Sequence, residues 1–170
     1  MTAQRPISVL LVDDHPLVRQ GLQAVLDGAG DIVVAGEAGD GDTAVQLAAE
    51  LQPDVVIMDL QLPGRHGVDA TRAIMASPPG PAVLVLTMFE DDDMVFSAMS
   101  AGAAGYLLKG ADGTDIITAV RSAAAGQAVF GAALAQRLRT WFTPGPRTAP
   151  AVDREGGGRS WARTATARAR

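Results

Sequence analysis

Five short apolar runs recur at similar intervals through the first two thirds of the chain. A run of about 4–8 apolar residues between turn residues is typical of a β-strand buried on both faces of a sheet. Such strands need a layer of helices on each side, so this feature restricts the fold more than any other. The runs predict strands at Ile7–Val12, Ile32–Ala38, Asp54–Met58, Ala82–Thr87 and Ala104–Leu108.

The segments between these runs have helical spacing of apolar residues. His15 and Pro16 open the first helical segment and Gly28 to Gly30 close it, followed by segments at Gly41–Leu51, Val68–Ala76, Asp91–Ser100 and Asp112–Ala125. Five strands alternating with five helices indicate right-handed βαβ units and a parallel sheet. We therefore expect an α/β, flavodoxin-like, doubly wound five-stranded sheet of order 2-1-3-4-5, with the ligand site beyond the carboxyl ends of the strands.

Polar side chains follow four of the five predicted strands. In the proposed order these four strands are neighbours, so we expect their end residues to meet at one shallow site. The residues are Asp13 and Asp14 after the first strand, Asp59 after the third, Thr87 at the end of the fourth and Lys109 after the fifth.

This set of residues predicts magnesium-dependent phosphoryl chemistry. Three carboxylates in one cleft repel each other unless a cation compensates them, and Mg²⁺ prefers oxygen ligands. A carboxylate can attack phosphorus to form an acyl phosphate, and Asp59 stands between the acidic pair and the Thr87–Lys109 pair. The expected metal ligands are Asp13, Asp14, the Asp59 carboxylate and the Gln61 backbone carbonyl. Lys109 adds a positive charge and the Thr87 hydroxyl a hydrogen bond.

Each residue also has a simpler structural interpretation. A single Asp after a strand is more often a helix cap than a ligand, and only the combination at four strand ends favours the functional one. His15 is expected to be a helix-entry residue beside Pro16, and His66 an exposed loop residue. Asp91 to Asp93 place favourable charge at a helix start.

Four segments of the sequence resemble response regulator receivers of the NarL/FixJ (LuxR-type) class. The similarity covers about residues 7–126 and rests on VDDHP at 12–16, MDLQLPG at 58–64, LT at 86–87 and GYLLK at 105–109. This resemblance implies Mg²⁺, phosphotransfer from a sensor histidine kinase and slow self-dephosphorylation. It also implies a switch in which Thr87 closes on the phosphoryl group and Tyr106 turns inward.

The sequence departs from the class at two positions near the site. Gln61 stands where a basic residue is common, which matters little if only its carbonyl binds metal. Gly110 follows Lys109 where many receivers have a proline in a cis peptide, so we expect an ordinary trans bond there.

The composition of the chain changes after the receiver-like part. We expect a receiver domain at 1–126, a linker helix at 127–142 and a disordered basic tail at 143–170, since the tail carries six Arg against two acids. The helix-turn-helix output domain usual in this class is not recognisable. PAVDRE at 150–155 faintly resembles the start of that domain, which suggests a frameshift or truncation near codon 155; the alternative is a natural single-domain receiver.

Three functions remain open, with a phosphorylation-driven switch as the leading one and a magnesium-dependent phosphohydrolase or a DNA-binding regulator as alternatives. Residues 1–142 carry 17 Asp or Glu against eight Lys or Arg, which makes nucleic-acid binding by this part unfavourable. The chain has no cysteine and no long apolar segment, so we expect a cytoplasmic protein without membrane contact. The oligomeric state is open, with a phosphorylation-linked homodimer as one alternative.

Overall fold

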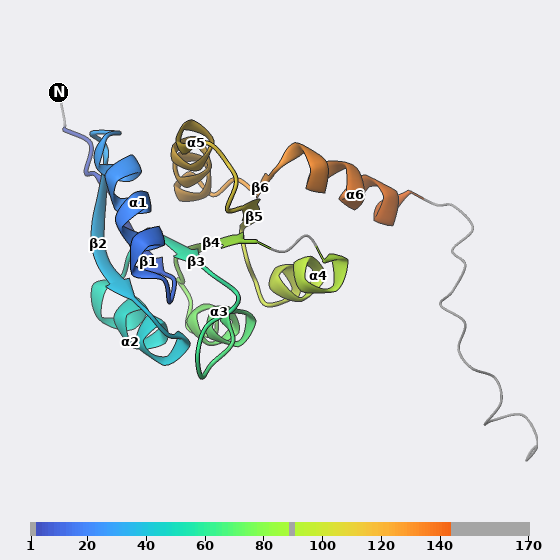
Figure 1. Ribbon diagram of the computed structural model, residues 1–170, viewed down its shortest axis with the longest axis horizontal. Helices are drawn as coiled ribbons and strands as arrows, with labels where there is room; N and C mark the ends of the chain where they lie inside the picture. Colours follow the sequence, from blue (N-terminus) through green and yellow to red (C-terminus); the bar gives the residue numbers. More distant parts are fainter. Residues whose placement is uncertain (1–2, 89–90, 144–170) are drawn as a thin grey trace, which may run out of the picture. The chain divides into compact units, whose positions relative to one another are not determined.

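A computed structural model describes residues 3–88 and 91–143 and contains one parallel β-sheet (Figure 1). The sheet has the order β2-β1-β3-β4-β5-β6. The flavodoxin-like order predicted for the first five strands is therefore confirmed. The strands are β1 Ile7–Val12, β2 Ile32–Ala38, β3 Val55–Met58, β4 Ala82–Thr87, β5 Gly105–Leu108 and β6 Val129–Phe130.

Several helices begin at residues suited to a helix start. Pro16 occupies the first turn of α1, and the carboxylates of Asp40 and Asp91 accept hydrogen bonds from backbone N–H groups at the starts of α2 and α4. His66 caps α3 by accepting from the N–H of Val68, a role that the sequence analysis did not predict. The helices are α1 Pro16–Asp27, α2 Gly41–Leu51, α3 Gly67–Met75, α4 Asp92–Ser100, α5 Gly113–Ala124 and α6 Ala132–Phe142.

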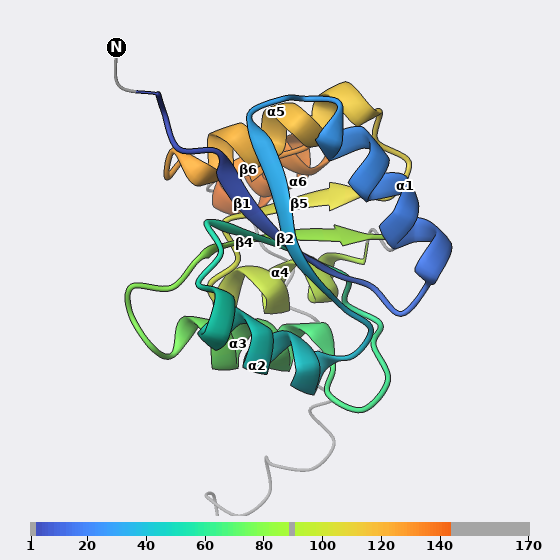
Figure 2. The same cartoon turned by 90° about the vertical axis from the view of Figure 1, so that its left-hand side faces the viewer.

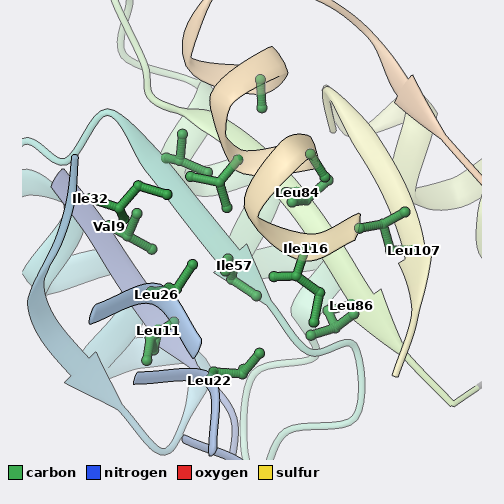
Figure 3. Packing of buried hydrophobic residues seen from close by; sticks show 14 residues of the cluster. Val9, Leu11, Leu22, Leu26, Ile32, Ile57, Leu84, Leu86, Leu107 and Ile116 are labelled. Atoms are coloured by element: carbon green, nitrogen blue, oxygen red, sulfur yellow. The ribbon is translucent and has the colours of Figure 1, made fainter. Parts of the chain in front are cut away.

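Helices cover both faces of the sheet, as strands with few polar residues require. Helices α1 and α5 lie on one face and α2, α3 and α4 on the other (Figure 2). Alternate residues of each strand point to opposite faces, so β1 contributes Val9 and Leu11 to the first core cluster and Leu10 and Val12 to the second. Figure 3 shows the first cluster, in which Ile116 of α5 lies among side chains of the sheet and α1.

The sheet has a sixth strand that the sequence analysis missed. Residues 129 and 130 lie in the segment for which a linker helix was expected, and they pair in parallel with Gly105 and Tyr106 of β5. A Cβ atom on Gly105 would overlap both the carbonyl oxygen and the Cβ of Val129. The missing side chain of Gly105 therefore lets the sixth strand approach.

The chain divides into two compact units, Met1–Ala135 and Gln136–Arg170, and the whole sheet belongs to the first. Within the segment 127–142, where a linker helix was expected, the helix α6 starts only at Ala132. Apart from Thr143, the predicted basic tail lies outside the described residues. Within the described ranges, no helix combines the length and apolar character needed to cross a membrane.

Candidate functional site

Sheet hydrogen bonds continue past the strand ends and hold the backbone of three predicted site residues. The N–H of Asp13 donates to Ala38 O at 3.1 Å, and the N–H of Asp59 donates to Val12 O at 2.9 Å. On the other side, the N–H of Lys109 donates to Thr87 O at 2.9 Å. Because all these strands run parallel, the three residues emerge at the same edge of the sheet.

Lys109 joins the two buried carboxylates of this edge. Its Nζ lies 2.6 Å from Asp13 Oδ2 and 3.2 Å from Asp59 Oδ2. The side chains of Asp13, Asp59 and Lys109 are only 3, 5 and 12% exposed. The residues brought together therefore come from the ends of β1, β3 and β5, as the sequence predicted, although 46 and 50 residues separate them along the chain.

A more exposed group lies at the mouth of the same site. Asp13 Oδ1 accepts a hydrogen bond from the backbone N–H of His15 at 2.9 Å. The Nδ1 atom of His15 lies 3.1 Å from that oxygen and 2.9 Å from Asp14 Oδ1. Asp14 and His15 therefore complete the site toward solvent, and His15 is closer to the acids than its expected role as a helix-entry residue required.

The site carries more negative than positive charge. Burial raises the pKa of the Asp59 carboxyl, and the neighbouring Asp13 raises it further, although Lys109 and the N–H of Gln61 act against both. Burial alone would lower the pKa of Lys109. The hydrogen bond to Asp13 and the charges of Asp59 and Asp13 outweigh it, so the pKa is raised and Lys109 stays an ammonium ion. One ammonium faces three carboxylates, an arrangement that favours binding of a cation.

The donor atoms of the site fit a small divalent ion. Asp13, Asp14, His15 and Asp59 each offer one atom, and these four atoms lie within 4.8 Å of one another. Carboxylate oxygens are the ligands that Mg²⁺ prefers, with water completing the shell. Gln61 is exposed, and its backbone N–H donates a hydrogen bond to Asp59, so Gln61 lies beside the group.

Thr87 and Tyr106 occupy buried positions on the neighbouring strands. Thr87 is fully buried as the last residue of β4, and its carbonyl holds Lys109 in place. Tyr106 is 3% exposed and lies opposite Val85 of β4 and Phe130 of β6. Tyr106 is therefore buried within the sheet.

The first residue of α3, Gly67, is a positioning residue that the sequence pattern did not predict. The N–H of Gly67 donates to Leu60 O at 2.8 Å, and a Cβ atom on Gly67 would overlap the carbonyl oxygen of Asp59. Only glycine allows this approach, so Gly67 helps to hold the backbone at Asp59. A glycine three residues after Pro-Gly at 63–64 gave no separate signal in the sequence.

The peptide bond after Lys109 is an ordinary one. In the described part of the chain the only cis peptide bond is Pro78–Pro79, so the trans bond predicted between Lys109 and Gly110 is confirmed.

The chain belongs to the family of response regulator receiver domains. The family's sequence pattern, described as "Response regulator receiver domain", matches residues 9–121, which include all the strand-end residues of the site. The resemblance found in the sequence is thereby confirmed.

Relatives with known names or structures support this membership. The chain is 48% identical over 121 residues to the transcriptional regulatory protein LiaR of Bacillus subtilis (strain 168), covering 71% of this chain and 57% of LiaR. It is 42% identical over 132 residues to the uncharacterized transcriptional regulatory protein YxjL of the same organism, covering 78% of this chain and 61% of YxjL. The chain thus spans about three fifths of these relatives.

A solved structure extends the similarity to three dimensions. The crystal structure of a two-component response regulator of the LuxR family from Aurantimonas sp. SI85-9A1 superposes with a TM-score of 0.76 at 34% identity. The alignment covers 80% of this chain and 97% of that one. The fold of this chain is therefore that of a receiver of this class.

Proposed function

We propose that this chain is a phosphorylation-activated signalling switch that accepts a phosphoryl group on Asp59 from a sensor histidine kinase. The observation that carries the proposal is the position of Lys109 Nζ between the buried carboxylates of Asp13 and Asp59. A buried ammonium and paired carboxylates at the carboxyl edge of a parallel sheet suit phosphoryl transfer, which needs alignment and charge neutralisation more than covalent catalysis.

Asp59 is the proposed nucleophile because of its place in the sheet. It follows β3, which lies between β1 with the acidic pair and β4 with Thr87. Asp13 is engaged on both oxygens, with His15 N–H on Oδ1 and Lys109 Nζ on Oδ2. Asp59 binds Lys109 through Oδ2 at the longer distance of 3.2 Å. An Asp59 carboxylate oxygen would attack phosphorus and form an acyl phosphate, while the kinase imidazole leaves.

The proposed metal ligands are Asp13, Asp14, the Asp59 carboxylate and the Gln61 carbonyl. Mg²⁺, when bound there, supplies positive charge for the phosphoryl oxygens. Asp13 and Asp14 would supply carboxylate ligands at the end of β1. Lys109, at the end of β5, would neutralise further negative charge on the phosphoryl oxygens.

The signal is proposed to leave the site through Thr87 and Tyr106. Both are buried, and they stand at the end of β4 and inside β5. A Thr87 hydroxyl that donates to a phosphoryl oxygen would bias an equilibrium in which Tyr106 takes its inward position. The chain would catalyse its own phosphorylation from a phosphodonor and its own slow dephosphorylation, and phosphorylation would also drive homodimerisation.

The second candidate is that this chain is the receiver part of a longer, DNA-binding regulator. The similar proteins YxjL and LiaR are called transcriptional regulatory proteins and are longer than the aligned region. In that case the described residues would be the receiver part, and the acidic composition of residues 1–142 argues that DNA contacts would lie elsewhere.

The test is phosphorylation of the purified chain by acetyl phosphate in the presence of Mg²⁺, followed by intact mass measurement. We expect one added phosphoryl group, and we expect the variant Asp59→Asn to add none. Asp69→Asn is the matched control, because Asp69 is an exposed carboxylate on α3 paired with Arg72. It should be labelled like the unchanged chain.

Two results would contradict the proposal. Labelling of Asp59→Asn at the normal level, mapped to another residue, would remove Asp59 as the acceptor. Rapid multiple turnover of a phosphomonoester by the unchanged chain would make the aspartyl phosphate an intermediate of a phosphohydrolase instead of a signal. Size-exclusion chromatography of the labelled sample reports the homodimer in the same experiment.

A further inference from the structure

His15 is the residue of the acidic site for which the proposed function has no use. Its side chain is 66% exposed, yet the ring turns Nδ1 toward the two acids that precede it. Nδ1 lies 3.1 Å from Asp13 Oδ1 and 2.9 Å from Asp14 Oδ1. One ring nitrogen and two carboxylate oxygens therefore surround one small volume at the mouth of the site.

The backbone keeps His15 in this place. Its N–H donates to Asp13 Oδ1, and the guanidinium of Arg19 donates to the carbonyl oxygen of Asp13. Pro16 follows and restricts the preceding residue to extended conformations, which agrees with φ −95° and ψ 111° at His15. The backbone at His15 is thus held in place without an ion.

The separations among the donor atoms suit a common ion. Two ligands in adjacent positions of an octahedral shell with bonds of about 2.1 Å lie about 3.0 Å apart, and opposite ligands lie about 4.2 Å apart. The two distances from His15 Nδ1 match the adjacent spacing. All four donor atoms, that of Asp59 included, lie within 4.8 Å of one another, which is close to the separation of opposite ligands.

Nitrogen changes which ions such a shell prefers. Mg²⁺ favours oxygen ligands, whereas imidazole suits first-row transition ions such as Ni²⁺, and Mn²⁺ accepts octahedral sites of mainly oxygen donors. We propose that His15 is an additional metal ligand through Nδ1, which makes this site bind divalent transition ions in preference to Mg²⁺. This inference rests on the proposed function, because it uses the same Asp13, Asp14 and Asp59 carboxylates.

A hydrogen bond from Nδ1–H to the two carboxylates would give the same distances. The two interpretations differ once an ion is bound, because a ligand stays at the ion and a hydrogen-bond donor is displaced by it. The experiment therefore has to observe the nitrogen in the metal-loaded chain.

The test is pulsed electron paramagnetic resonance of Mn²⁺ bound to the full chain, produced without a histidine tag. The chain has two histidines, so the variant His66→Asn leaves His15 as the only one, while Asn keeps a capping side chain at the start of α3. Grown with ¹⁵N-histidine, this variant should show a directly coordinated ¹⁵N in place of the ¹⁴N of the unlabelled sample. His15→Phe, which keeps a ring at an exposed position, should bind Mn²⁺ without imidazole coupling.

Calorimetric titration gives a second measurement. We expect His15→Phe to weaken Ni²⁺ binding by roughly 10-fold or more and Mg²⁺ binding by much less, since only the nitrogen ligand is lost. Bound Mn²⁺ without histidine coupling, or equal losses for Ni²⁺ and Mg²⁺, would overturn the role of His15 and leave Asp59 phosphorylation intact. If no ion binds and acetyl phosphate also fails to label Asp59, the proposed function itself is wrong.

Discussion

An aspartate flanks each end of strand β3, and the pKa values of the two carboxyls are shifted in opposite directions. Asp54 precedes the strand and Asp59 follows it. Burial alone would raise the pKa of Asp54, but hydrogen bonds from Ser8 and Arg5 outweigh it and leave the pKa below its usual value. At Asp59, burial and the charge of Asp13 outweigh Lys109, and the pKa is raised.

The difference lies in the number of donors that each carboxylate meets. Asp54 receives the backbone N–H and the hydroxyl of Ser8 at 2.9 and 3.2 Å and the Arg5 guanidinium at 2.8 Å. Asp59 shares one ammonium with Asp13. At the amino end of β3, the hydrogen bonds to the Asp54 carboxylate are therefore made and contribute stability. At the carboxyl end, Asp59 and Asp13 keep an excess of negative charge, which a cation or phosphoryl chemistry can use.

The largest expected effect comes from removing the ammonium at the carboxyl edge. Lys109→Met leaves Asp13 and Asp59 buried without a counter-charge, and in metal-free buffer we expect the free energy of unfolding to fall by about 3 kcal/mol. Urea unfolding followed by circular dichroism measures it, and added Mg²⁺ should recover part of the loss. Arg72→Met, which breaks the exposed pair with Asp69, is the control and should cost less than about 0.5 kcal/mol.

A smaller effect on stability is expected when the two aspartates that flank β3 are replaced one at a time. Asp54→Asn weakens the hydrogen bonds to Ser8 and Arg5, so we expect a loss of about 1–2 kcal/mol with normal phosphorylation. Asp59→Asn removes a repelling charge, so the metal-free chain should be as stable as before or more stable while phosphorylation disappears. The same urea titration compares both variants. A loss of stability in Asp59→Asn larger than that in Asp54→Asn would contradict the contrast between the two edges.

The smallest expected effect is the pH dependence that Asp54, at the amino end of β3, gives to the free energy of unfolding. Because the folded pKa of Asp54 lies below its unfolded value of about 3.9, its contribution is present above that pH. It is lost as the pH falls through the folded pKa. We therefore expect Asp54→Asn to flatten the acid limb of a plot of unfolding free energy against pH below about 4. An equally steep acid limb in that variant would show that Asp54 does not carry it.

Much of the site could be predicted because it depends on where strands end. Apolar runs mark the ends of β1, β3, β4 and β5 in the sequence, and parallel strands bring their carboxyl ends to one edge. That rule is enough to bring Asp13, Asp59 and Lys109 together. The approach of Gly67 to the Asp59 carbonyl and the aim of the His15 ring depend on contacts across loops, and no periodicity in the sequence reports them.

Strand β6 likewise depends on a contact between segments that the sequence pattern does not report. Two apolar residues are too few to show a period, and the segment was expected to be helical. Val129 and Phe130 become a strand because β5 offers an unpaired edge and Gly105 leaves room beside it.

The sequence by itself determined the parallel α/β sheet, its strand order and the acids at its carboxyl edge, because alternation of buried runs and helices leaves few ways to bury the apolar surface. Only the tertiary structure decided which carboxylates are satisfied. Asp54 and Asp59 are the same residue type at the two ends of one strand. Against the effect of burial, hydrogen bonds from Ser8 and Arg5 lower the pKa of Asp54, whereas burial and the charge of Asp13 raise the pKa of Asp59 against the effect of Lys109.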